Sequence, residues 1–95
     1  MAFGAGGRGR ADIAGPTREE AIKSYFEPAR RRGEIEAVIV SGVIHNTLGL
    51  SGRHAAVCNA LQDKTGKLQQ RARAELIRIE EPNPSSTTRF IYRLL

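Results

Sequence analysis

Residues 41–51 read Ser-Gly-Val-Ile-His-Asn-Thr-Leu-Gly-Leu-Ser, and this stretch decides the fold. Ser41 is a good helix N-cap, because its hydroxyl can accept a hydrogen bond from a free backbone amide of the first turn. Gly49 suits the left-handed residue that ends many helices. The stretch therefore predicts a short helix from Ser41 to about Leu48 and then a turn, with three apolar side chains facing the core: Val43, Ile44 and Leu48.

Another helix is predicted directly after this turn, over residues 51–64; it is the third helix in chain order. Val57 and Leu61 lie four residues apart, so they share one face of the helix and are expected in the core. The next segment, residues 67–75, is compatible both with a helical turn and with the lead-in to a strand, and the sequence does not decide between them.

Strands are predicted on both sides of this helical pair. Residues 35–40 are mostly apolar and β-branched, which is typical of a short strand. Residues 76–80 and 89–94 are predicted strands as well, and the Pro, Asn and Ser residues of the intervening segment 81–88 are a strong turn signal. The two C-terminal strands therefore form a hairpin with a polar tip, of which residues 82–88 are expected to be mobile.

A further helix is predicted before the first strand. Thr17-Arg-Glu-Glu20 matches a capping box, in which Thr17 is the N-cap and Glu20 reaches back to it. Apolar side chains then recur at helical spacing. Pro28 is expected to kink or interrupt this helix near Phe26, because proline has no amide hydrogen to donate. Arg30, Arg31 and Arg32 are expected to be solvated at its C-terminal end.

The chain is long enough for one small domain, at 95 residues. Residues 1–15 are rich in glycine and hold little to bury, so we expect a flexible arm followed by a folded domain over 16–95. The longest apolar run, Ala37–Val40, is far too short to span a membrane. No signal peptide is visible, and Cys58 has no second cysteine to pair with, so a cytoplasmic location is expected.

Positive charge is concentrated towards the two ends of the chain. The net charge is +5, from 15 Lys and Arg against 10 Asp and Glu. Residues 1–33 carry seven basic and four acidic side chains, residues 34–63 one and three, and residues 64–95 seven and three. A small basic domain can bind nucleic acid or an anionic surface, although net charge alone identifies neither.

The predicted order of helix, strand, helix, helix, strand, strand resembles the winged helix-turn-helix superfamily. Residues 41–51 resemble the first helix and glycine turn of many transcription regulators, and Val57-Cys-Asn-Ala-Leu61 resembles the middle of their recognition helix. His45 stands where these proteins usually have a small residue, and the longer spacing to Val57 fits a third helix that begins late, near Arg53. The resemblance implies an α+β fold of three helices, a short strand and a C-terminal hairpin wing over about 76–94.

This resemblance also implies binding to double-stranded DNA, without catalysis. The third helix of such proteins enters the major groove, while the wing contacts the backbone or minor groove. Arginine can pair with guanine, and asparagine or glutamine with adenine. The implied DNA-binding residues are Arg53, His54, Asn59, Gln62, Lys64, Lys67, Arg71, Arg73 and Arg89. Arg8 and Arg10 are candidates for an arm in the minor groove. The role is either transcription regulation or another DNA process.

The main alternative is a winged-helix module that binds a protein partner or forms a homodimer. The acidic balance of residues 34–63, with Asp63 on the third helix, favours this alternative. RNA binding is a weaker option, because the chain lacks the aromatic pair of common single-strand readers. His54 and Cys58 have a spacing that can bind a metal, but too few further ligands are available. We expect no metal, no cofactor, no enzymatic activity and no membrane partner.

Overall fold

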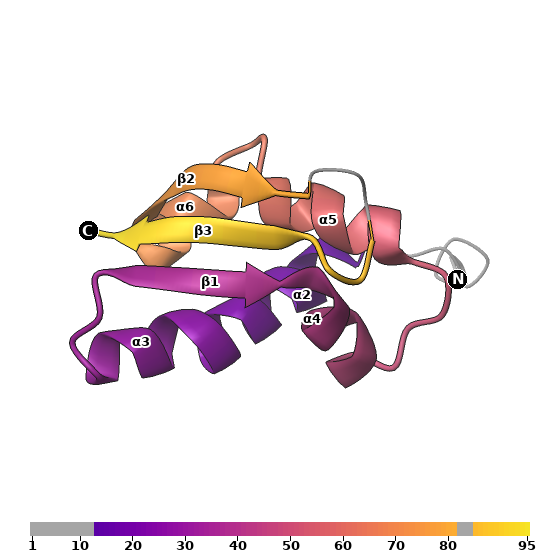
Figure 1. The fold of residues 1–95 in the computed structure, drawn as a ribbon, viewed down its shortest axis with the longest axis horizontal. Helices are drawn as coiled ribbons and strands as arrows, with labels where there is room; N and C mark the ends of the chain where they lie inside the picture. Colours follow the sequence, from indigo (N-terminus) through magenta and orange to yellow (C-terminus); the bar gives the residue numbers. More distant parts are fainter. Residues whose placement is uncertain (1–12, 82–84) are drawn as a thin grey trace, which may run out of the picture.

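The computed structural model describes residues 13–81 and 85–95. Figure 1 shows an α+β fold, as predicted, in which an antiparallel sheet has helices behind it and along its β1 side. The elements are, in chain order, the helix α2 (Ala14–Ala21), the π-helical turn η1 (Ile22–Phe26), the helix α3 (Glu27–Arg31), the strand β1 (Glu36–Val40), the helices α4 (Ser41–Thr47), α5 (His54–Gln62) and α6 (Lys67–Ala72), and the strands β2 (Ala74–Glu80) and β3 (Arg89–Leu94).

The described part of the sheet has the strand order β1-β3-β2, so the last strand of the chain lies in the middle. Both pairings are antiparallel, with Val38 opposite Ile91 in one and Leu76 opposite Tyr92 in the other. The three predicted strands are confirmed, and β2 begins two residues earlier than expected. The undecided segment 67–75 is now assigned, because it forms α6 and then the first residues of β2.

The core lies between the sheet and the helices. Phe26 and Tyr92 meet edge to face, with ring centroids 5.1 Å apart. Val57 and Leu61 of α5 are fully buried, which confirms the predicted inner face of this helix. The hydroxyl of Tyr92 donates a hydrogen bond to the backbone carbonyl of Leu61. This bond satisfies one of the carbonyls that a helix leaves free in its last turn.

The inner face of α4 differs from the prediction. Ile44 is buried as expected, but Val43 is 51% exposed and His45 is buried in its place. The buried stripe of this helix runs through Ser41, Ile44 and His45, and Val43 lies beside it on the solvent side. Two polar residues can be buried here because each has a hydrogen-bond partner: Ser41 bonds to a backbone carbonyl, and His45 to a backbone amide.

The first helix begins three residues before the predicted cap. Thr17 is not the N-cap but a fully buried residue inside α2, and its amide donates to the carbonyl of Ile13 at 2.9 Å. The helix extends towards the N-terminus because Ile13 packs against the core. Ala14 and Gly15 are therefore helical and not part of an arm. The rest of the predicted arm, with Arg8 and Arg10, lies outside the described residues.

The regular α-helix is interrupted before Pro28, near Phe26 as expected, but the helix does not end there. The backbone instead widens into the π-helical turn η1 directly before this proline and continues as α3. Arg30, expected to be solvated, donates from its guanidinium group to the backbone carbonyls of Ala72, Arg73 and Leu95. This side chain therefore ties the end of the first helix to the end of α6 and to β3.

Residues 85–88 of the hairpin loop pack against the start of α4, although the sequence predicted a mobile tip. The amide of Ser41 donates to the carbonyl of Thr88, and the amide of Gly42 to the carbonyl of Ser86, both at 3.0 Å. Ser41 is the first helical residue and Val40 the N-cap. Since valine has no side-chain acceptor, the loop carbonyls satisfy the free amides of the first turn. Residues 82–84 of the predicted mobile tip lie outside the described part.

Candidate functional site

Helix α5 presents a polar face beyond its buried one. Arg53 is its N-cap, so the helix begins late, as the spacing before Val57 allowed and not at residue 51. Asn59 is exposed and Gln62 is half-buried. Both side chains remain available on the surface, because the core contacts of the helix are made by Val57 and Leu61.

A groove of about 490 Å³ lies between this face of α5 and the start of α2. Three cationic side chains line it, Arg18 from α2, Arg53 from the start of α5 and Lys64 from just beyond its end, together with Asn59. Within residues 13–81 and 85–95, none of the three cations has a carboxylate within 4.0 Å. The groove therefore combines three cations that form no ion pair with an amide that can donate and accept hydrogen bonds, and Asp63 adds one carboxylate to its lining.

Arg18 is the site residue that sequence reasoning missed. The motif around it was interpreted as a capping box, which placed Arg18 at an exposed helix start. The burial of Thr17 and Ala21 places Arg18 beside the inner face of α2, towards α5. The signal in the sequence was Ile13, four residues before Thr17, which extends the apolar stripe by one turn.

Asp63, which counted against an anionic partner, also lines the groove, but its carboxylate is hydrogen-bonded within the protein. It is 5% exposed, and its two carboxylate oxygens accept hydrogen bonds from the backbone amides of Leu68 and Gln69, at 2.9 and 2.8 Å. These amides belong to the first turn of α6, where the helix dipole favours a negative charge. The Asp63 carboxylate thus joins the end of α5 to the start of α6.

The basic residues of α6 do not reach the groove. Arg71 forms an ion pair with Glu19 of α2 at 2.6 Å, and this guanidinium lowers the pKa of the Glu19 carboxyl below its usual value. Lys67 and Arg73 are exposed, and neither lines the groove. The structure therefore brings together three of the nine implied DNA-binding residues: Arg53, Asn59 and Lys64.

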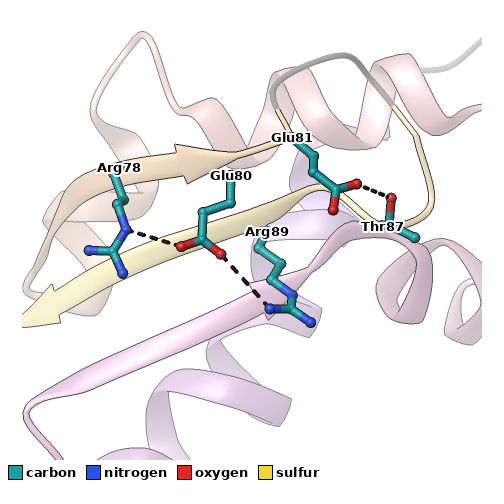
Figure 2. Close-up of polar contacts among 5 residues, drawn as sticks. All are labelled: Arg78, Glu80, Glu81, Thr87 and Arg89. Carbon is teal, nitrogen blue, oxygen red and sulfur yellow. Dashed lines mark hydrogen bonds and ion pairs between the residues drawn. The ribbon is translucent and has the colours of Figure 1, made fainter.

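Arg89 lies on the exposed face of the sheet and has an acidic neighbour. Figure 2 shows Glu80 between two arginines, with Arg78 at 3.2 Å and Arg89 at 3.8 Å. In the same view Thr87 donates to the carboxylate of Glu81 at 2.6 Å, which links the two ends of the hairpin loop. The positive charge of Arg89 is therefore partly compensated where the sequence implied a free phosphate contact.

His54 is half-buried and turned towards the protein. Its ring stacks on that of His45, with ring centroids 3.8 Å apart and planes 17° from parallel. Cys58, one turn further along α5, is buried. Over the described ranges, no group of three or more His, Cys, Asp or Glu side chains is placed to hold a metal ion.

Comparison with known proteins returned no match: no family model, no curated protein and no solved structure is significantly similar to the chain. The helices of the described part are all too short or too polar to cross a bilayer. The case for a function therefore depends on the geometry and chemistry of the described residues.

Proposed function

We propose that the chain is a winged-helix protein that binds double-stranded DNA without catalysis. In this proposal α5 enters the major groove, and the hairpin of β2 and β3 contacts the backbone. Two features support the fold assignment: the order of helices and strands along the chain, and the central place of β3 in the sheet. The short helix α6 is an addition between the recognition helix and the hairpin.

The groove beside α5 is the observation that carries this proposal. Arg53, Lys64 and Arg18 supply unpaired positive charge for phosphates, which position a protein on DNA without reading its sequence. Arg53 and Asn59 have the chemistry to pair with guanine and adenine edges. Asp63 also lines the groove, and its carboxylate oxygens are occupied by the amides at the start of α6.

The exposed face of the sheet favours a second candidate function, binding to a protein. Val38 and Ile77 are 45% and 44% exposed there, and Ile35 is exposed at the edge of the face. Of its arginines, Arg78 and Arg89 are paired with Glu80, and Arg93 lies opposite Glu36 and Glu75 in the strand register. An apolar surface with compensated charges suits a protein better than a phosphate backbone.

Titration of a labelled duplex at two salt concentrations tests the first function. Wild type is expected to bind, and to bind more weakly at the higher salt concentration. Arg53→Ala should lose about 5- to 150-fold in affinity, which corresponds to about 1–3 kcal/mol for a specific base contact. Arg32→Ala is the matched control, because it removes the same charge from a side chain already paired with Glu34.

The outcome separates the two candidate functions. An equal loss in both variants would mean that only net charge matters, and the groove would lose its role. If wild type binds no duplex even at low salt, DNA binding is wrong, and the exposed face of the sheet becomes the surface to investigate.

A further inference from the structure

Two histidines meet where α4 turns into α5. His45 comes from the last turn of α4, and His54 is the first residue of α5. Their rings stack face to face, and the His45 side of the pair is almost completely buried, at 4% exposure. They are the two histidines of the chain. Both imidazoles of the chain are therefore part of this one stack.

The stack also holds the start of α5 through a hydrogen bond. The backbone amide of Arg53 donates to Nε2 of His45 at 3.1 Å. Nε2 can accept this bond only when it carries no proton. Arg53 is the N-cap of α5 and lines the groove. The imidazole of His45 thus fixes the backbone of the residue that we assign to DNA recognition.

Among the described residues, neither ring has a carboxylate within 4.0 Å. The carboxylates of the neighbouring α2 are engaged elsewhere, Glu19 with Arg71 and Glu20 with the Ser24 hydroxyl. On α5 itself, Arg53 precedes His54 and is cationic, and Cys58, one turn further on, is a buried thiol. The Nδ1 atoms of both rings are buried without a hydrogen-bond partner among the described residues. A proton added here would meet no acceptor and no anion.

We propose that the two stacked histidines form a proton-sensitive latch on the start of α5. A proton on Nε2 of His45 replaces the acceptor with a donor, so that two N–H groups face each other and the bond to Arg53 is lost. A second proton on His54 would place two cations in contact. The latch then opens and frees the first turn of α5. His45 is a positioning residue in this scheme, and its effect on DNA rests on the proposed function.

Duplex affinity at pH 7.5 and pH 5.5 tests the latch, since carboxylates stay ionised across this range. Simple attraction predicts tighter binding in acid, because protonated histidines add positive charge. The latch predicts the opposite for wild type, a loss of about tenfold, comparable to the net value of one hydrogen bond. In His45→Gln the amide oxygen can accept from the same Arg53 amide without titrating, so affinity should change less than twofold.

His54→Gln is the second variant and keeps the Arg53 bond while removing the stack. It should retain most of the acid weakening, because a proton on Nε2 of His45 would still break the bond to Arg53. Wild-type binding that is unchanged or tighter at pH 5.5 overturns the latch. Complete loss of the pH effect in His54→Gln also overturns it, since the proton would then act on His54 and not through the bond to Arg53.

Hydrogen exchange in the free protein tests the latch independently of DNA. The protection factor of the Arg53 amide should fall about tenfold between pH 7.5 and pH 5.5 in wild type and stay constant in His45→Gln. Equal protection at both pH values overturns the latch. If wild type binds no duplex at either pH but shows the fall in protection, the proposed function fails while the latch stands.

Discussion

The groove beside α5 and the exposed face of the sheet carry similar cations but offer them differently. In the groove, Arg18, Arg53 and Lys64 have no ion-pair partner among residues 13–81 and 85–95. On the sheet, Arg78 and Arg89 share the carboxylate of Glu80 (Figure 2), and Arg93 has Glu36 and Glu75 opposite it on the neighbouring strands. An anionic partner gains most binding free energy from cations that have no ion pair within the protein. The comparison teaches that uncompensated charge, and not the number of basic residues, marks the candidate interface.

The two regions also differ in what lies beneath and beside them. Helix α5 rests on the buried side chains of Val57 and Leu61, so its exposed face is held from below by the core. The sheet turns Val38 and Ile77 outwards, where they make little contribution to the core. Changes beneath α5 should therefore affect the whole domain, and changes on the outer sheet face should act locally.

The largest effect is expected from removing the support of α5. Leu61→Ala should lower the free energy of unfolding by about 2–5 kcal/mol, because it leaves a cavity under the helix. Ile77→Ala, on the exposed sheet face, should cost well under half as much. Urea unfolding of both variants measures the difference. Equal losses would break the distinction between a helix held by the core and a sheet face that is not.

Gly42→Ala should be the next most damaging change. A Cβ at residue 42 would lie 2.4 Å from the backbone oxygen of Ser86, so the loop must move away from α4. We expect a loss of about 1–3 kcal/mol in unfolding free energy. The control is Gly15→Ala, which meets nothing within 4 Å in the helix α2 and should stabilise slightly. Similar melting temperatures for the two variants would show that the packed loop contributes nothing.

Base reading can be separated from attraction by selection over a randomised duplex library. Arg53→Ala should flatten the preference at one base pair by about 1–3 kcal/mol. Lys67→Ala, outside the groove, should weaken all sequences alike. A flat profile in wild type would remove sequence-specific reading and leave only nonspecific binding. A change in preference for Lys67→Ala would extend the interface beyond the groove.

The smallest expected effect sharpens the comparison directly. Glu80→Gln frees Arg78 and Arg89 from their shared carboxylate, which makes the sheet face resemble the groove. The slope of log affinity against log salt should then steepen by about one ion, while Arg89→Ala in the wild-type background should change it by less than one. If Arg89→Ala alone removes a full ion from the slope, the ion pair with Glu80 does not restrain Arg89.

Local patterns predicted the elements whose partners lie close in sequence or repeat with a clear period. The strands and the inner face of α5 followed from alternation and from the four-residue spacing of Val57 and Leu61. Of the groove, the sequence supplied Arg53, Asn59 and Lys64 as candidates. It did not show that they would be left unpaired, because pairing depends on which carboxylates the fold brings near.

The predictions that failed concern contacts between segments that are distant in the sequence. Arg30 reaches carbonyls 42, 43 and 65 residues away, and no local pattern encodes such a bond. His45 is buried where Val43 was expected, and its ring accepts a hydrogen bond from the amide of Arg53, eight residues further along the chain. The early start of the first helix depends on a core site for Ile13. Tertiary contacts override local propensity in each case.

The π-helical turn η1 has a consequence for how the chain can vary in length. Buried residues of the first helix occur at positions 17, 21, 26 and 29, so one interval is five residues where its neighbours are four and three. The wide turn absorbs the extra residue and keeps Phe26 on the inner side. Deleting one residue between Ile22 and Tyr25 would restore intervals of four, four and three, the period of a regular α-helix. A related chain shorter by one residue at this place would thus align with a gap and keep the same core.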